Sequence, residues 1–544
     1  MSNGALTVPA PYNEPVLEFA PGSPERREIR QQLNRLSNKT IDIPARIGGR
    51  KVRTRRLAKA VMPHDHAHVL ATWHRCRKKE VDRAIRAALE ARPRWAAMPW
   101  SDRAAIFLKA AELLAGRHRQ VLNAATMLSQ SKNVHQAEID AACELIDFWR
   151  FNAEYMERIY DEQPDSSPGC WNMMEHRPLE GFVFAVTPFN FTSIAGNLPT
   201  APAMMGNVVL WKPASTAVYT AHHLMDLLEE AGLPPGVINM VPGSGGEVGD
   251  PALASPDLAG IHFTGSTEVF QGMWETVGRN IRRYRSYPRI VGETGGKDFV
   301  FAHRSASVPA LVTALVRGAF EYQGQKCSAA SRAFIPRSIW PRVERRLLAE
   351  TARLSMGDPA DFTHFVNAVI DRNAFDSIKR AIQYASRSDE ARILIGGKCD
   401  ARRGYFIEPT VILARRPDFK LLREEIFGPV LTIHVYRDAD LDRALSICDS
   451  GSTYGLTGAV FAQDRAAIRK IRDALVNTAG NFYINDKPTG AVVGQQPFGG
   501  SRASGTNDKA GSYLNLVRWV SPRSIKETFV PPTSVVYPFM APGE

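Results

Sequence analysis

Short apolar runs alternate with helix-forming segments from residue 181 onward, and this alternation restricts the chain to an α/β fold. The runs are Phe182 to Val186, Asn207 to Trp211, Val237 to Val241 and Gly260 to Phe263. Continuous apolar runs are typical of parallel strands that helices cover on both faces. A helix from Ser215 to Ala231, ended by Gly232, separates the second run from the third. The pattern predicts βαβ units and a parallel sheet with ligand sites at the carboxyl ends of its strands.

The segments on either side of this stretch predict further elements. From residue 293 to about 488, a helix over 308–322 and a strand over 429–435 indicate a second α/β domain. Residues 1–60 contain closely spaced prolines and little periodicity, so we expect an irregular arm with one short helix near 25–36. Near the other end, residues 514–520 alternate like a strand that a monomer need not pair.

Composition and charge exclude several classes of protein. Hydrophobic residues make up 44% and charged residues 23% of the 544, which excludes a disordered chain. No apolar run approaches the roughly 18 residues that a membrane-spanning helix needs. The net charge is +12, but the basic residues are dispersed, so we expect neither a nucleic-acid partner nor a membrane.

The positions of the cysteines, histidines and early acidic residues indicate where the protein is located and whether it binds a metal ion. The six cysteines form no Cys-x-x-Cys pair, which fits a reducing compartment. The early acidic residues Glu14, Glu18 and Glu25 are atypical of a targeting segment, so a cytoplasmic location is expected. His64, His66 and His68 would share one face of a strand; a polar surface strand explains them, no metal is predicted, and their role is left open.

Five segments are individually short but jointly informative. They are Thr187-Pro188-Phe189-Asn190-Phe191, Trp211-Lys212-Pro213, Gly292 to Lys297, Gln323 to Ser328 and Glu424 to Pro429. In that order, with Phe263 to Thr267 and Pro497 to Gly500, they resemble the NAD(P)-dependent aldehyde dehydrogenase superfamily across roughly residues 60 to 528. The separation of 34 residues between Glu293 and Cys327 matches that family's spacing of base and nucleophile.

A narrower likeness rests on Gln325 to Ser328, Asn485 to Gly490, Gly494 to Gly500, Ser504 to Asp508 and the early Asn13-Glu14-Pro15. These segments are similar to the branch of the family that oxidises L-glutamate γ-semialdehyde, the open form of Δ1-pyrroline-5-carboxylate, to L-glutamate in proline catabolism. The resemblance implies NAD as cofactor. It also implies functional coupling with a separate proline dehydrogenase.

The resemblance assigns three catalytic residues. Cys327 would add to the aldehyde carbon, so that the resulting oxyanion can expel a hydride. The amide of Asn190, with the backbone N–H of Cys327, would stabilise that oxyanion. Glu293, in a glycine-rich loop, would be the base for hydrolysis of the thioester. Lys326 adds positive potential that could favour the thiolate.

For the cofactor, the resemblance places Lys212 near the adenosine ribose and Ser266 at the pyrophosphate beside a helix N-terminus. Glu425 would contact the nicotinamide ribose, with Phe427 at the same end. Many NAD-preferring relatives carry a glutamate three residues after the lysine, whereas this chain has Ser215. The glycines from Gly243 to Gly249 miss the usual dinucleotide spacing by one residue and are equally typical of a flexible turn.

For the substrate, the resemblance implies contacts at both ionic ends. Its α-carboxylate would be held by Ser328 and by the backbone N–H groups of Gly490 and Ala491. Glu144 would face the ammonium group, and the aliphatic stem would pack between Phe191 and Phe498. Without the resemblance, Glu144 belongs to a helix face with Asp140 and Asp147 that is typical of a solvated surface.

The expected architecture is α/β and aldehyde dehydrogenase-like, with a Rossmann-like NAD domain, a catalytic α/β domain and a small β oligomerisation element. The boundaries are an N-terminal arm over 1–60, an NAD-binding domain over 61–160 and 181–292, a catalytic domain over 293–488, and the oligomerisation element over 161–180 and 489–544. Such an element implies a homodimer or a multiple of dimers.

Three alternatives stay open. The chain could be a hydrolytic aldehyde dehydrogenase for another semialdehyde or a neutral aldehyde. It could transfer the acyl group to coenzyme A, although relatives of that kind generally lack a glutamate at the position of Glu293. It could also be a catalytically silent binding protein on the same fold.

Overall fold

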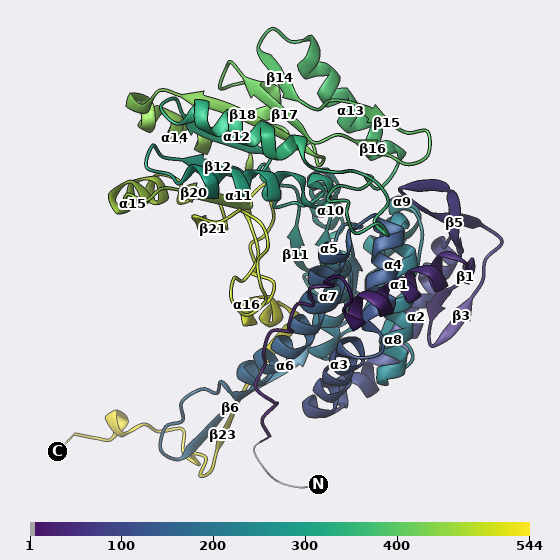
Figure 1. Cartoon of the computed structure of the whole chain (residues 1–544). Helices are drawn as coiled ribbons and strands as arrows, with labels where there is room; N and C mark the ends of the chain where they lie inside the picture. The colour runs from purple at the N-terminus through teal and green to yellow at the C-terminus, as the bar shows by residue number, and fades with distance from the viewer. Residues whose placement is uncertain (1–5, 544) are drawn as a thin grey trace.

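The first alternating stretch forms a seven-stranded sheet, shown with the whole chain in Figure 1. The computed structural model describes residues 6–543, so residues 1–5 of the expected arm and residue 544 of the expected oligomerisation element lie outside the described residues. The strand order is β11-β10-β7-β8-β9-β2-β3, and the five strands from β11 to β9 are parallel. Their bounds are β7 Phe182–Val186, β8 Val208–Lys212, β9 Ile238–Met240, β10 Leu258–Thr264, β11 Arg289–Glu293, β2 Ala45–Ile47 and β3 Arg50–Val52.

Helices cover this sheet and bury its apolar strands. Every residue of β8 and β10 is buried, as expected for parallel strands between helical layers. The helices of this half are α2 Lys78–Ala97, α3 Trp100–Ala115, α4 Arg119–Gln130, α5 Val134–Ala137, a π-helical turn Glu138–Glu144, α6 Leu145–Asp161, α7 Thr192–Met204, α8 Val218–Ala231, α9 Gly245–Leu253 and α10 Thr267–Asn280. Ser244 and Ser266 accept hydrogen bonds at the N-termini of α9 and α10.

The second alternating stretch forms another seven-stranded sheet, in the order β14-β17-β18-β13-β12-β20-β21. Only the β14–β17 pair is antiparallel. The strands are β12 Phe299–Ala302, β13 Arg332–Pro336, β14 Ala391–Ile395, β17 Thr410–Ala414, β18 Val430–Tyr436, β20 Thr457–Phe461 and β21 Asn481–Ile484, and the helices are α11 Val308–Phe320, α12 Trp340–Ala352, α13 Arg372–Arg387, α14 Leu441–Ser450 and α15 Arg465–Ala474. The predicted α/β class is therefore confirmed.

The first 60 residues are more regular than expected. The predicted helix is present as α1 Pro24–Ser37, which packs against α4. However, β1 Ile41–Ile43, β4 Leu57–Met62 and β5 Asp65–His74 form a three-stranded sheet, and β2 and β3 join the first seven-stranded sheet. The prediction of an irregular arm was wrong for residues 41–60. There β2 pairs with β3 and with the distant β9, while β1 and β4 both pair with β5.

A two-stranded ribbon projects from the body of the molecule in Figure 1. It pairs β6 Cys170–Pro178 with β23 Val520–Thr528 in antiparallel register. The strand expected over residues 514–520 is wrong, because α16 Tyr513–Leu516 and a 3-10 turn Val517–Trp519 occupy that segment. Leu516, Trp519 and Val520 are buried in the larger core, and their spacing of three and one residues is helical.

Two features of residues 6–543 concern membranes and metal ions. None of the helices described is both long and apolar enough to cross a membrane. Within the same residues, no group of three or more His, Cys, Asp or Glu side chains could hold a metal ion. The three histidines in and beside β5 have separate partners: His64 contacts Ser131, His66 contacts the carbonyl of Ala401, and His68 contacts the carbonyl of Ser37.

Candidate active site

Cys327 lies where two cavities meet. It follows α11 through a tight turn in which Tyr322 and Gln323 both have positive φ angles, 49° and 54°. Cys327 is 8% exposed. Among the described residues, it is the one that lines both a cavity of about 780 Å³ and a second cavity of about 350 Å³. A sulfur atom in this position can meet two ligands, one from each cavity.

The surroundings of the Cys327 thiol favour its protonated form. Burial raises its pKa well above the usual range, and the neighbouring carboxylates of Glu293, Asp298 and Glu425 raise it further. Lys326 does not offset them, because its Nζ donates to Glu321 at 3.1 Å. The thiol therefore needs a base, or a positive charge brought by a ligand, before it can act as a nucleophile.

Asn190 lies in the loop between β7 and α7 and lines the larger cavity. Its side chain is buried, and Nδ2 donates to the carbonyl of Gln325 at 3.1 Å. This bond ties the carboxamide to the loop that carries Cys327. The amide has a second N–H, which the bond to Gln325 leaves available for an oxyanion.

A buried ion pair, formed by Lys132 and Asp140, fixes the start of α7, which directly follows the loop of Asn190. Asp140 accepts from the backbone N–H groups of Thr192 and Ser193 at 3.0 and 2.9 Å, at the start of α7. Lys132 donates to Asp140 at 2.6 Å. The prediction of a solvated acid stripe was wrong for Asp140 and Asp147, which are only 1% and 3% exposed, because each finds donors far away in the sequence.

Glu293 ends β11 and lines a third, much smaller cavity of about 30 Å³. Glu144, Phe498 and Asp508 line the same space. Burial raises the pKa of the Glu293 carboxyl to about 8, against a smaller lowering by Lys509. A carboxyl with this pKa can accept a proton from water near neutral pH and release it again, which is the requirement for a general base.

The larger cavity collects four of the five residues expected at the cofactor. Lys212, Ser266, Glu425 and Phe427 all line it. Ser215 does not, since its hydroxyl donates to the carbonyl of Gly243. The N-terminal residues of α9 and α10 also line this cavity, and helix N-termini present free N–H groups to anions.

The polar groups in this cavity suit a dinucleotide. Burial lowers the pKa of Lys212 to about 8, so the ammonium gains from an anionic or hydroxyl-rich partner. Burial raises the pKa of Glu425 to about 7, and this carboxylate accepts from Gly296 N at 2.8 Å. Phe427, at φ 58°, packs edge-on against Phe189. Two helix N-termini for phosphates, a lysine and a carboxylate for ribose hydroxyls, and an apolar end form a set that fits NAD.

The second cavity collects all six residues expected at the substrate, and we name it the substrate chamber. Glu144, Phe191, Ser328, Gly490, Ala491 and Phe498 line it together with Cys327. The Ser328 hydroxyl lies 2.8 Å from Thr489 Oγ1. Gly490 has φ +93°, a conformation that favours glycine.

Charged side chains of the chamber include both signs. Glu14, Glu144 and Asp147 are acidic, and Lys326 and Lys487 are basic. Burial lowers the pKa of His135, so its imidazole is neutral near pH 7. Burial, together with the charge of Asp140, raises the pKa of Glu144 to about 8. A ligand that bears both an ammonium and a carboxylate can be satisfied here by groups of opposite sign.

Several lining residues carried no signal in the sequence. Val16 comes from the N-terminal arm, and His135 comes from a segment without a motif of its own. Asp250, on α9, lines the cofactor cavity. Asn13 and Lys487 also line the substrate chamber, and both stand in segments that already marked the narrower family resemblance.

The chain is similar in sequence to known proteins over almost its whole length. The aldehyde dehydrogenase family profile matches residues 51–520. The mitochondrial delta-1-pyrroline-5-carboxylate dehydrogenase of Dictyostelium discoideum is 52% identical over 540 residues, which cover 99% of this chain and 97% of that protein. The human mitochondrial protein of the same name is 49% identical over 529 residues, covering 97% and 94%.

A crystal structure is similar over nearly the whole chain. The Delta-pyrroline-5-carboxylate dehydrogenase from Mycobacterium tuberculosis, bound with NAD, superposes with a TM-score of 0.96 at 55% sequence identity, covering 99% of this chain and 100% of that one. The expectation of a cytoplasmic location is contradicted, because the Dictyostelium and human relatives are named mitochondrial.

Proposed function

Because the chain belongs to the aldehyde dehydrogenase family, we propose that it oxidises L-glutamate γ-semialdehyde to L-glutamate with NAD. The semialdehyde is the open form of Δ1-pyrroline-5-carboxylate, the compound in the names of the relatives. The observation that carries the proposal is the position of Cys327 between a cavity suited to a dinucleotide and a chamber with charges of both signs.

Catalysis begins at the thiol of Cys327. Its sulfur forms a bond to the aldehyde carbon, its proton passes to a base, and the carbonyl oxygen becomes an oxyanion. The Asn190 amide, fixed by Gln325, donates to that oxyanion where its charge develops. NAD, when bound, supplies the acceptor for the hydride that leaves the same carbon.

Loss of the hydride leaves a thioester on Cys327, which water must hydrolyse. The Glu293 carboxylate takes a proton from the attacking water, and the new C–O bond replaces the C–S bond. Because the pKa of Glu293 is about 8, a substantial fraction is ionised between pH 7 and 9. The free thiol then returns to its starting state as the carboxylic acid product leaves.

The cofactor and the substrate are held by the residues that line their cavities. We assign Lys212, Ser266, Glu425 and Phe427 to NAD.

For the semialdehyde, Ser328 and the N–H groups of Gly490 and Ala491 bind the α-carboxylate, and Glu144 binds the ammonium. Phe191 and Phe498 pack along the stem between the two ends.

We also propose a role for each domain and for the projecting ribbon. The first sheet and its helices form the NAD-binding domain, the second sheet forms the catalytic domain, and the β6–β23 ribbon, with residues 529–543 beyond it, mediates a homodimer or a multiple of dimers. Support comes from the exposed side chains of Trp171 on the ribbon and Phe529 just after it, 51% and 61% exposed. Because the substrate arises by oxidation of proline, we also propose coupling to a separate proline dehydrogenase.

One experiment tests the proposed function. NADH formation is followed with Δ1-pyrroline-5-carboxylate and NAD, without coenzyme A, and kcat/KM is compared with that for pentanal, which lacks both ionic groups. We expect steady turnover, a clear preference for the semialdehyde, and no turnover by Cys327→Ala. Equal kcat/KM for both aldehydes would favour a different hydrolytic aldehyde dehydrogenase, and absence of NADH would favour a silent binding protein.

A further inference from the structure

The N-terminal segment Asn13–Leu17 forms part of the wall of the substrate chamber, although it lies far from Cys327 in the sequence. Asn13, Glu14 and Val16 line the chamber directly. The backbone N–H of Glu14 donates to Asp147 at 2.7 Å, and that of Leu17 donates to Glu138 at 2.9 Å. The segment is therefore bound along its length to the helices behind the chamber.

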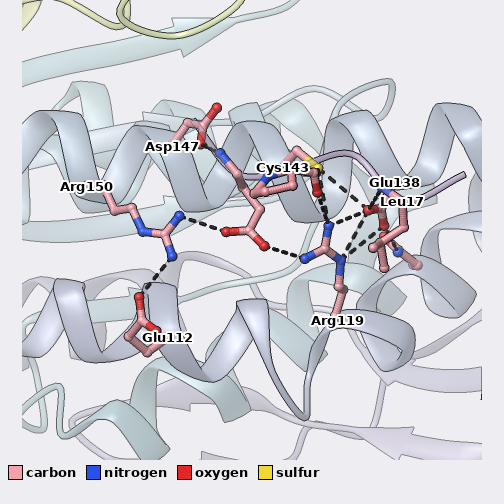
Figure 2. Close-up of polar contacts among 10 residues, drawn as sticks. Leu17, Glu112, Arg119, Glu138, Cys143, Asp147 and Arg150 are labelled. Atoms are coloured by element: carbon pink, nitrogen blue, oxygen red, sulfur yellow. Dashed lines mark hydrogen bonds and ion pairs between the residues drawn. The ribbon is translucent and has the colours of Figure 1, made fainter. Parts of the chain in front are cut away.

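Buried charges hold this segment in place. Figure 2 shows the polar contacts that Arg119 and Arg150 make there. Glu14 accepts from Arg119 through one oxygen and from Arg150 through the other. The side chains of both arginines are less than a tenth exposed, and Glu14 is 10% exposed. Arg119 also pairs with Glu138. Removing one member of such a network leaves an uncompensated buried charge, so the segment has little freedom to move.

Asn13 links this fixed segment to the loop of Gly490. Its Nδ2 donates to Asp147 Oδ2 and to the carbonyl of Val493, both at 2.8 Å. Its Oδ1 accepts from Gln495 Nε2 at 2.9 Å. One carboxamide thus makes two hydrogen bonds to the loop and one to α6, which is buried at Asp147.

The loop over residues 490–496 has few other hydrogen bonds, although the side chain of Val493 is buried. Among the described residues, its remaining hydrogen bonds join Val492 to Gln495 and Gln496 within the loop itself. Gly490 and Gln495 are exposed. Because the loop also carries the backbone N–H groups of Gly490 and Ala491, its position decides where an α-carboxylate can be held.

We propose that Asn13 is a positioning residue that sets the carboxylate end of the substrate chamber by tethering the 490–496 loop. The inference rests on the proposed function and deepens it, since it assigns part of the discrimination for an amino-acid aldehyde to the N-terminal arm. Asn13 acts through Val493 and Gln495 rather than on the reacting atoms. The neutral end of an aldehyde without a carboxylate does not need the loop, so its turnover is independent of the tether.

The test separates a positioning role from general loss of structure. Asn13→Ala is compared with the wild type for KM and kcat with Δ1-pyrroline-5-carboxylate, for KM with NAD, and for kcat/KM with pentanal. We expect KM for the semialdehyde to rise about tenfold, the factor that corresponds to 1.4 kcal/mol. The values for NAD and pentanal should stay within about twofold. Hydrogen exchange of residues 489–496 should become faster.

The matched control is Glu157→Gln, which weakens the contact of the same arm at Val8 N, 2.7 Å from Glu157 Oε2 and outside the chamber. It should leave all four values unchanged. If Asn13→Ala does not fold, Gln495→Leu removes one loop bond from an exposed position and should raise KM for the semialdehyde by a smaller factor.

Two outcomes would overturn the inference: an unchanged KM for the semialdehyde in folded Asn13→Ala, or an equal loss with pentanal. A wild-type protein without activity on the semialdehyde would instead refute the proposed function.

Discussion

Replacing Glu293 by Gln tests both the role of Glu293 as the base and its raised pKa. The pKa of the buried carboxyl is about 8, against an ordinary 4.5, so the native protein holds a proton that the unfolded chain releases between these pH values. Stability therefore falls as pH rises from about 4.5 to 8, because the native state binds more protons there. At 1.36 kcal/mol for each pH unit, the loss reaches up to about 5 kcal/mol above pH 8.

The glutamine side chain in Glu293→Gln cannot ionise, so the variant escapes this loss while it loses the base. We expect the melting temperature of Glu293→Gln to exceed that of the wild type increasingly from pH 6 to pH 9. Over the same range, wild-type kcat should rise with an inflection near pH 8. The variant should give one rapid equivalent of NADH per site and then turn over about 10²- to 10⁴-fold more slowly, because general-base catalysis of hydrolysis is missing.

The assay combines thermal melts at several pH values with stopped-flow NADH absorbance. Glu90→Gln, an exposed carboxylate on α2, is the control, and its melting temperature should track the wild type at every pH. A kcat within threefold of wild type with an unchanged pH profile would refute the assignment of the base. A melting-temperature difference that does not grow with pH would refute the buried, protonated state of Glu293.

Three other perturbations test the rest of the site. Asn190→Ala should lower kcat by about 10²- to 10³-fold in steady-state assays, because one oxyanion donor is lost; a change below tenfold would contradict the role. Glu144→Gln should reduce kcat/KM for the semialdehyde about ten- to a hundredfold, the weight of a charge-assisted hydrogen bond, and leave pentanal unaffected; equal losses would contradict ammonium binding. Lys132→Met should destabilise the fold by about 3 to 5 kcal/mol in denaturant melts, because it leaves Asp140 unpaired. The double variant Lys132→Met/Asp140→Leu should recover part of that loss, and no recovery would contradict the pairing.

Much of the fold follows from local apolar patterns. The run Phe182 to Val186 matches β7 residue for residue, since a fully buried parallel strand needs continuous apolar side chains. The prediction of a strand over residues 514–520 failed because the same segment also places Leu516, Trp519 and Val520 at helical spacing. Packing against the larger core selects the helical conformation, and periodicity alone cannot reveal that choice.

Some residues of the candidate site could be predicted from the sequence, and others could not. Cys327, Asn190 and Glu293 stand in segments that resemble a known family, so their association was predictable before any contact was seen. Asp147 was not, because its donor Asn13 lies 134 residues away. An acidic residue on a helix face is ordinarily solvated, and only the folded arm shows that this one is buried.

The most direct test of the account is the covalent bond at Cys327. Glu293→Gln is mixed with Δ1-pyrroline-5-carboxylate and NAD, quenched in acid within the NADH burst, digested and examined by mass spectrometry. The account predicts a γ-glutamyl group on the peptide that contains Cys327 and on no other cysteine. NADH formation by Cys327→Ala at the wild-type rate, with no acyl group on that peptide in Glu293→Gln, would contradict it.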